Sequence, residues 1–143
     1  MGKIGIMELI VVLFFVIAFF LPVVFYLITL QSTLNEVSLK NRRMNPGEVW
    51  LMLIPIFGLV WQFIMVNRIA DSLHAEFLDR NISGYEDRPG YSIGIAYCVL
   101  FCCSVIPFLG VFASLGGLVC WIIYWVRIND FKRLLIQAKS RII

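Results

Sequence analysis

Long apolar runs separated by short polar stretches set the pattern of this chain. The first run, residues 4–30, has about 27 residues, more than the ~20 that an α-helix needs to cross a bilayer. It is about twice as long as a signal-peptide core and no small-residue cleavage site follows it, so it predicts a retained membrane helix. Leu27, Leu30, Leu34 and Val37 recur at helical spacing, which predicts that the helix extends beyond the membrane.

The second apolar run, residues 49–66, is interrupted by Pro55 and Gly58. The pattern is compatible with a kinked full crossing, and also with a re-entrant hairpin whose tip lies at these two residues. Each arm of such a hairpin, with about eight residues, rises only ~12 Å. The apolar pattern alone leaves both interpretations open.

The third apolar region, residues 91–126, contains no formally charged residue. As one helix it would be ~54 Å long, well beyond the ~30 Å hydrocarbon core, so it is expected to fold back as a helical hairpin. Pro107 and Gly110 mark the expected tip. The Ile-Pro-x-x-Gly pattern at residues 106–110 repeats the pattern at residues 54–58, which indicates an internal repeat.

Small residues recur every four positions on the first arm of this hairpin, and more of them lie on the second arm. Such faces let membrane helices approach one another closely. They predict either a tight intramolecular hairpin or a docking groove for a partner helix. The helix-packing candidates are Gly90, Gly94, Cys98, Cys102, Ala113 and Gly117.

Two amphipathic helices are expected outside the membrane, over residues 67–81 and 127–143. In the second, apolar and basic residues occupy opposite sides. This pattern suits a helix on an anionic membrane surface, and it equally suits packing against the helix at residues 66–77. The candidates for binding a membrane surface or a partner are Arg127, Phe131, Lys132, Arg133, Leu135 and Lys139.

The basic residues indicate which loops share a side of the membrane. If residues 49–66 are re-entrant, eleven of the 12 Lys and Arg residues lie on one side and only Lys3 on the other. If this segment crosses, the division is nine to three. Because cytoplasmic loops are enriched in Lys and Arg, the distribution favours the re-entrant hairpin, with both loops and the tail in the cytoplasm.

Composition agrees with a membrane protein and argues against other classes. Hydrophobic residues make up 61% of the chain, against about half in soluble domains. The net charge of +3 is modest and no basic run carries interleaved aromatic residues, so nucleic acid is not an expected partner. The four cysteines lie inside apolar segments without a nearby His or carboxylate, which indicates packing rather than metal binding or a disulfide framework.

Catalytic chemistry has little support in the sequence. His74, the only histidine, lacks convergent partners, and Glu8 at the end of the first run is interpreted as a boundary residue rather than an intramembrane acid. No nucleophile–base pair or phosphate-binding loop is present. No catalytic, cofactor-binding or metal-binding residue is predicted, and the chain is not expected to be an enzyme.

A family resemblance covers residues 26–73. Pro46-Gly47, then Trp50, Ile54-Pro55 and Trp61, with a polar helix after a basic loop, resembles small bacterial membrane domains of unknown function. The resemblance implies a bacterial cytoplasmic membrane, and it implies no activity because none is assigned to such domains.

The sequence therefore predicts one all-α, multi-pass membrane domain over residues 1–143, with four hydrophobic segments and amphipathic cytoplasmic helices. The expected function is that of a structural or interaction subunit, or scaffold, of a membrane complex. Its expected partners are membrane lipids and either a membrane protein or further copies of this chain. Two alternatives are an oligomeric channel or transporter component, for which Gln62 is the best lumen candidate, and a lipid-interacting membrane-surface module.

Overall fold

All regular secondary structure is helical in the computed structural model, which describes residues 2–142 with the exception of the Ile142 side chain. No strand occurs in that range, so the expected all-α class is confirmed. Residues 1 and 143, the ends of the expected domain, lie outside the described part. The elements in chain order are α1 (Ile6–Glu36), the 3-10 helix η1 (Pro46–Leu53), α2 (Phe57–Asp79), α3 (Tyr91–Cys103) and α4 (Gly110–Ile142).

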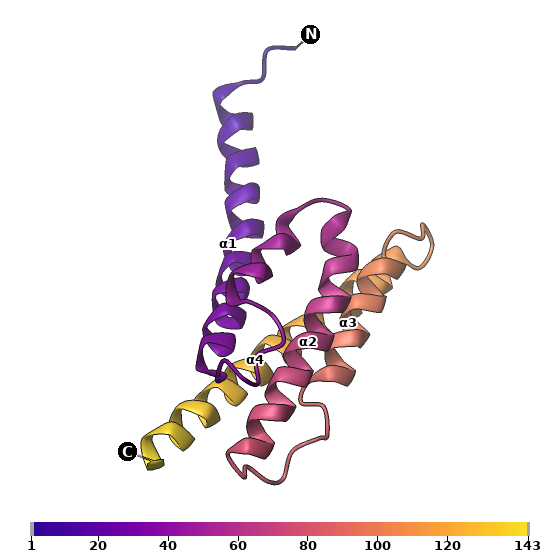
Figure 1. Ribbon diagram of the computed structural model, residues 1–143. Helices are drawn as coiled ribbons and strands as arrows, with labels where there is room; N and C mark the ends of the chain where they lie inside the picture. Colours follow the sequence, from indigo (N-terminus) through magenta and orange to yellow (C-terminus); the bar gives the residue numbers. More distant parts are fainter. Residues whose placement is uncertain (1, 143) are drawn as a thin grey trace.

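Helix α1 has two halves with different surroundings. Its start is capped by Glu8, whose carboxylate accepts a hydrogen bond from the Gly5 N–H at 3.2 Å, so this acid serves the helix terminus. The side chains of residues 6–21 are exposed, and this half of α1 extends away from the rest of the molecule (Figure 1). The other half is packed: the stripe of Leu27, Leu30 and Leu34 is buried.

The apolar run at residues 49–66 forms two arms rather than one continuous helix. Helix η1 ends at Leu53, the chain turns at Pro55 and Ile56, and α2 begins at Phe57 (Figure 1). Ile56 adopts a φ of 65°, which is uncommon for a β-branched residue and marks a tight reversal. Gly58 makes the reversal possible, because a Cβ there would lie 2.2 Å from the Met52 carbonyl oxygen.

The amphipathic helix expected at residues 67–81 is not a separate element. It is the second part of α2, which runs without interruption from Phe57 to Asp79. Its apolar face faces the core as the periodicity predicts, since Ile69, Leu73 and Phe77 are buried. The sequence becomes polar after residue 66, but a change of polarity does not end a helix.

The region from 91 to 126 folds back at residues 104–109, with α3 and α4 as its arms. The turn shares with the first hairpin a close approach of a glycine to an earlier carbonyl. A Cβ on Gly110 would lie 2.7 Å from the Ser104 carbonyl oxygen, six residues earlier, as Met52 is six residues before Gly58. Helix α4 then continues without a break to Ile142, so the tail expected at residues 127–143 is its C-terminal part.

The core forms where α1, α3 and α4 meet. The hydroxyl groups of Tyr26 and Tyr97 are 3.1 Å apart and hydrogen-bonded, and both residues are fully buried. The Tyr97 ring lies 5.4 Å from the ring of Tyr124 on α4. A second aromatic contact joins α2 to α4, where the Phe77 and Phe131 rings are 5.7 Å apart. These contacts fix the two hairpins against the C-terminal half of α1.

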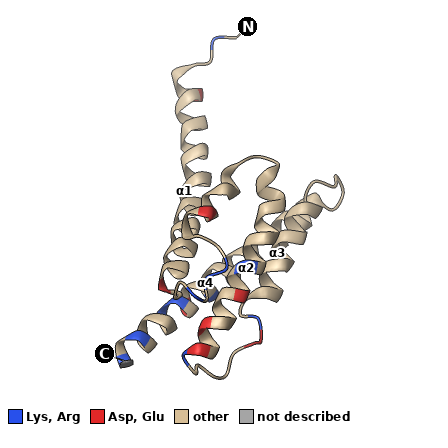
Figure 2. Cartoon of the chain, viewed as in Figure 1, with Lys and Arg blue, Asp and Glu red and all other residues tan. Residues whose placement is uncertain are grey.

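Two helices are long and apolar enough to cross a membrane, α1 and residues Gly110–Arg141 of α4. Figure 2 shows that most charged residues gather at the end of the molecule away from the N-terminus. Between Glu8 and Glu36 no residue carries a formal charge. The molecule therefore has an apolar end, formed by the free half of α1 and the two turns, and a charged end.

Candidate functional site

The apolar end exposes hydrophobic side chains on three separate parts of the chain (Figure 1). They are the free half of α1 (residues 6–21) and the tips of the two hairpins. At the tips, Ile56 is 83% exposed and Phe108 is 96% exposed. A contiguous apolar surface such as that of the free half of α1 marks a contact with lipid or with another protein, because monomeric soluble proteins rarely present it to water.

Most backbone N–H groups of the first tip are paired within the turn. The N–H groups of Ile54 and Gly58 donate to the carbonyls of Leu51 and Ile54, and those of Phe57 and Leu59 bond within the same turn. Pro55 has no N–H group. Inside hydrocarbon no water is available to pair with a free backbone donor, so such a turn is suited to an apolar environment.

The second tip pairs the donors at its start. Val105 and Ile106 donate to the carbonyls of Cys102 and Cys103. Pro107 again removes one donor from the turn. The Ser104 hydroxyl, the only polar side chain of the turn, donates to the Phe101 carbonyl at 2.6 Å. Both turns are therefore apolar in nearly all their side chains, and part of their backbone donors are paired within the turn.

Two tryptophans mark one level along α1. The Trp50 indole N–H donates to the Gln31 side-chain oxygen at 2.9 Å, and the Trp125 indole N–H donates to the Thr29 hydroxyl at 3.0 Å. Beyond this level the sequence of α1 becomes polar. Indole groups collect where hydrocarbon meets water, so this level is the candidate boundary between the apolar and charged ends.

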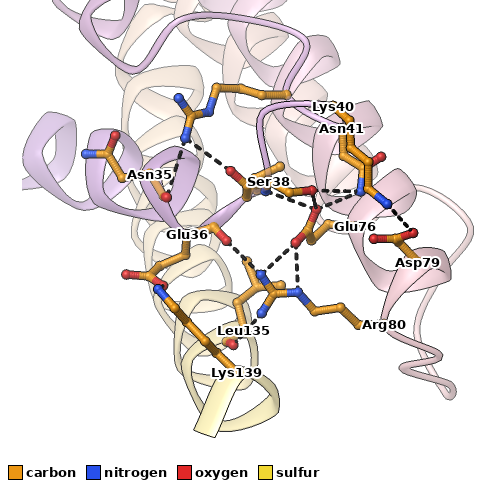
Figure 3. A network of polar contacts seen from close by, with 12 residues as sticks. Asn35, Glu36, Ser38, Lys40, Asn41, Glu76, Asp79, Arg80, Leu135 and Lys139 are labelled. Carbon is orange, nitrogen blue, oxygen red and sulfur yellow. Dashed lines mark hydrogen bonds and ion pairs between the residues drawn. The ribbon is translucent and has the colours of Figure 1, made fainter. Parts of the chain in front are cut away.

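The charged end is organised around Glu76, which is 1% exposed (Figure 3). Its carboxylate accepts hydrogen bonds from the Ser38 N–H at 3.1 Å, the Ser38 hydroxyl at 2.6 Å and the Asn41 amide at 2.7 Å. Burial alone would raise the pKa of the Glu76 carboxyl. The hydrogen bonds from Ser38, Asn41 and Arg80 outweigh burial, so the pKa lies below its ordinary value.

Arg80 connects three elements at this point. Its guanidinium lies 2.6 Å from the Glu76 carboxylate and donates to the backbone carbonyls of Glu36 at 2.9 Å and Leu135 at 2.7 Å. The last carbonyls of a helix lack intrahelical partners, so the bond to Glu36 caps the C-terminus of α1. The Glu76–Arg80 anchor thus ties the end of α1 and the C-terminal part of α4 to α2 (Figure 3).

Sequence analysis did not identify this anchor. A visible signal was the spacing of Glu76 and Arg80, an acidic and a basic residue four positions apart on one helix. The remaining partners could not be found from the sequence, because two of them are backbone carbonyls of distant helices.

Arg88 fixes the loop between α2 and α3. It donates to the Asp71 carboxylate at 2.7 Å and to the Asn67 side-chain oxygen, and it lies 4.0 Å from the centre of the Tyr91 ring. Its hydrogen bond with Asp71 raises the pKa of the Arg88 guanidinium further above the usual range. Arg68 lies 3.6 Å from Glu48 on η1.

The small residues of the α3–α4 hairpin face the inside of the molecule, except Cys102, which is exposed. A Cβ on Gly94 would lie 2.5 Å from the Val66 side chain, and a Cβ on Gly117 would lie 3.3 Å from Leu100. The faces are filled by helices of the same chain and leave no groove for a partner at these positions. The other expected packing residues, all buried, are Gly90, Cys98 and Ala113.

The tail residues divide into two groups. Phe131 and Leu135 are buried within the fold, so this apolar stripe is not free to enter a membrane surface. The burial of this stripe differs from the membrane-surface interpretation. The periodicity of the sequence identifies an apolar face but does not show what covers that face. The basic residues lie outside: Arg127 pairs with Glu86 at 3.2 Å, Lys139 lies 3.8 Å from Glu36, Arg133 is exposed and Lys132 is half-buried.

The remaining candidates for chemistry are separated from one another. Gln62 is 3% exposed and its Nε2 has no hydrogen-bond partner within residues 2–142, so it does not line an open channel within one copy of the chain. His74 lines a shallow cavity of about 350 Å³ beside Phe77 and Tyr85. Among the described residues, no group of three or more His, Cys, Asp or Glu side chains comes together in a way that could hold a metal ion.

Comparisons of the chain with protein-family models, with curated proteins and with solved structures found no match.

Proposed function

We propose that this chain is a small integral membrane protein that acts as a structural or interaction subunit of a membrane complex. The single observation that carries the proposal is the free half of α1, whose apolar side chains at residues 6–21 are covered by no other part of the described chain. A helix that is apolar on all sides is stable only inside a membrane or a large protein core. Each large apolar side chain left in water would cost about 1.5–3 kcal/mol of burial energy.

The four hydrophobic segments are α1, the hairpin of η1 with the start of α2, α3, and the first part of α4. We place α1 across the bilayer and the first hairpin in the membrane as a re-entrant element. The charge distribution supports this arrangement, because it leaves only Lys3 on the side opposite the other basic residues. The resemblance of residues 26–73 to bacterial membrane domains points to the cytoplasmic membrane of a bacterium.

The interaction surface of this subunit is the free half of α1. The small-residue faces that sequence analysis offered as a docking groove are occupied by helices of the same chain. On α1, by contrast, Phe14, Phe15, Phe19 and Phe20 are all exposed. A partner helix, or α1 of a second copy, packs here through large aromatic side chains.

The proposal is tested by photo-crosslinking in intact membranes. A benzophenone amino acid replaces Phe14 in one variant and Phe20 in another, and Leu39, an exposed residue of the charged end, serves as the control position. We expect a discrete protein adduct from positions 14 and 20, either a dimer of this chain or one defined partner. Adducts with lipid alone from both α1 positions would contradict an interaction role.

A further inference from the structure

The depth to which the body of the molecule enters the membrane can be measured along α1. Neighbouring elements cover α1 only from Pro22 onward, and the tryptophan level that marks the boundary lies at Thr29 and Gln31. From residue 22 to residue 30 the helix rises ~13 Å. The hydrocarbon core of a bilayer is ~30 Å thick, so the covered part of α1 corresponds to about one leaflet.

Three of the four hairpin arms are about as long as one leaflet is thick. Helix η1 has 8 residues, which at the 3-10 rise span at most ~16 Å, and only its part from Trp50 onward lies on the apolar side of the tryptophan level. The apolar part of α2, residues 57–66, spans ~15 Å, and α3 with 13 residues spans ~20 Å. The apolar part of α4 is longer, but α4 runs obliquely across the molecule (Figure 1). Three of the four arms are therefore too short to cross the core.

The two tips are built for hydrocarbon rather than for water. A loop that emerged on the far side would place Ile56 and Phe108, the most exposed side chains of the tips, in water. Neither tip contains a charged residue or an amide side chain that could hold it among headgroups. Part of their backbone donors are paired within the turns, which lowers the cost of placing the tips in the bilayer interior.

From these observations we infer that both hairpins enter a single leaflet from the charged side and end near the bilayer midplane, so that α1 alone crosses. The surface formed by the two tips then has one partner, the acyl chains of the cytoplasmic leaflet. This inference rests on the membrane placement proposed above, and it replaces the expected multi-pass arrangement with one crossing.

The repeated turn explains how both hairpins reach the same depth. Gly58 and Gly110 each allow a carbonyl six residues earlier to approach the helix start, and each follows a proline by three positions. The turns thus reverse the chain within a few residues and add little length to the arms. The basic residues remain at the other end of the hairpins, where anionic headgroups attract them.

The test measures depth at the two tips. Single cysteines replace Ile56 or Phe108 in a background that lacks the four native cysteines, and a spin label is attached in bilayers that contain anionic lipid. Two control positions are Leu39 at the charged end and Gly5 at the start of α1. Collision rates with oxygen and with a water-soluble nickel complex report the depth of each label.

We expect the labels at positions 56 and 108 to be the deepest of the four, accessible to oxygen and shielded from nickel on both sides. Nickel access at position 108 equal to that at position 5 would show that the second hairpin crosses, and would overturn the inference while α1 still spans. If position 5 instead reports the same side as position 39, α1 does not cross and the proposed function itself fails.

A second measurement covers the case in which the cysteine-free background does not fold. Ile56→Lys and Phe108→Lys are made in the native chain, with Leu39→Lys as the matched control. A lysine near the midplane is expensive, so we expect both tip variants to lose most of their membrane-inserted protein while the control keeps it. Normal levels of Phe108→Lys would place that tip in water and overturn the inference.

Discussion

Arg80 lies 2.6 Å from Glu76, one turn earlier on α2, and the same guanidinium holds the carbonyl of Glu36 at the end of α1. Both side chains are largely buried. The pair therefore connects the proposed membrane-crossing helix to the charged end of the molecule, and its energetics can be tested directly.

Replacing Arg80 with Ala is expected to destabilise the fold by about 3–5 kcal/mol, because it leaves the Glu76 carboxylate buried without its cation. Lys40→Ala is the control, since Lys40 pairs with Asp79 at 2.8 Å but is exposed. An exposed pair contributes only about 0–1 kcal/mol. Thermal or denaturant unfolding in mild detergent measures both. If both substitutions changed stability by the same small amount, the stabilising role of the Glu76–Arg80 anchor would be contradicted.

The lowered pKa of Glu76 predicts a dependence of stability on pH. Because the folded state binds the proton more weakly than the unfolded state, the stabilisation is complete above the ordinary carboxyl pKa. It is lost as the pH falls through the lower pKa of the folded state. We expect the melting temperature to fall with acidification, and to fall less in Glu76→Gln. A parallel acid response in both proteins would assign the effect to other carboxylates.

Gly94→Leu is expected to destabilise the protein by about 1–3 kcal/mol, as overpacking of interiors does. Even a Cβ at this position would lie 2.5 Å from Val66 and 2.9 Å from Tyr124. Gly47→Ala is the matched control, because no heavy atom lies within 4 Å of a Cβ there. The measurement is the unfolding midpoint of the two variants. Unchanged stability of Gly94→Leu would mean that α3 does not pack against α2 and α4 as described.

Substitutions in the C-terminal part of α4 distinguish packing against the core from binding to lipid. Phe131→Ala should cost about 3–5 kcal/mol of stability, as for large aromatic residues in a core. Ile136→Ala, on the exposed side of α4, should change stability little. If Phe131→Ala weakens binding to anionic vesicles but leaves the unfolding midpoint unchanged, the apolar stripe faces lipid and not the core.

The features of the fold that depend on local sequence pattern could be predicted from the sequence. The stripe through Leu27, Leu30 and Leu34 identified the buried face of α1, and the two Ile-Pro-x-x-Gly motifs located both turns. Helix lengths were less accessible, because α2 and α4 continue through changes from apolar to polar sequence that were interpreted as boundaries.

The candidate site was less predictable than the fold. Glu76 and Arg80 form hydrogen bonds with Ser38, Asn41 and backbone carbonyls that are remote in sequence. Only the folded chain brings these groups together. The face of the tail with Phe131 and Leu135 was identified correctly as apolar. Other helices bury this face through tertiary packing. The periodicity of the sequence does not reveal that packing.

The most direct test of the membrane arrangement is the sidedness of three positions. Single cysteines at Gly5, Leu39 and Ser83, in a background without the native four, are exposed to a membrane-impermeant thiol reagent in intact cells. All three residues lie at the surface of the molecule. We predict that position 5 is labelled while positions 39 and 83 are protected until the membrane is permeabilised. Labelling of position 39 in intact cells, with position 83 protected, would show a full crossing by residues 49–66 and would contradict the arrangement.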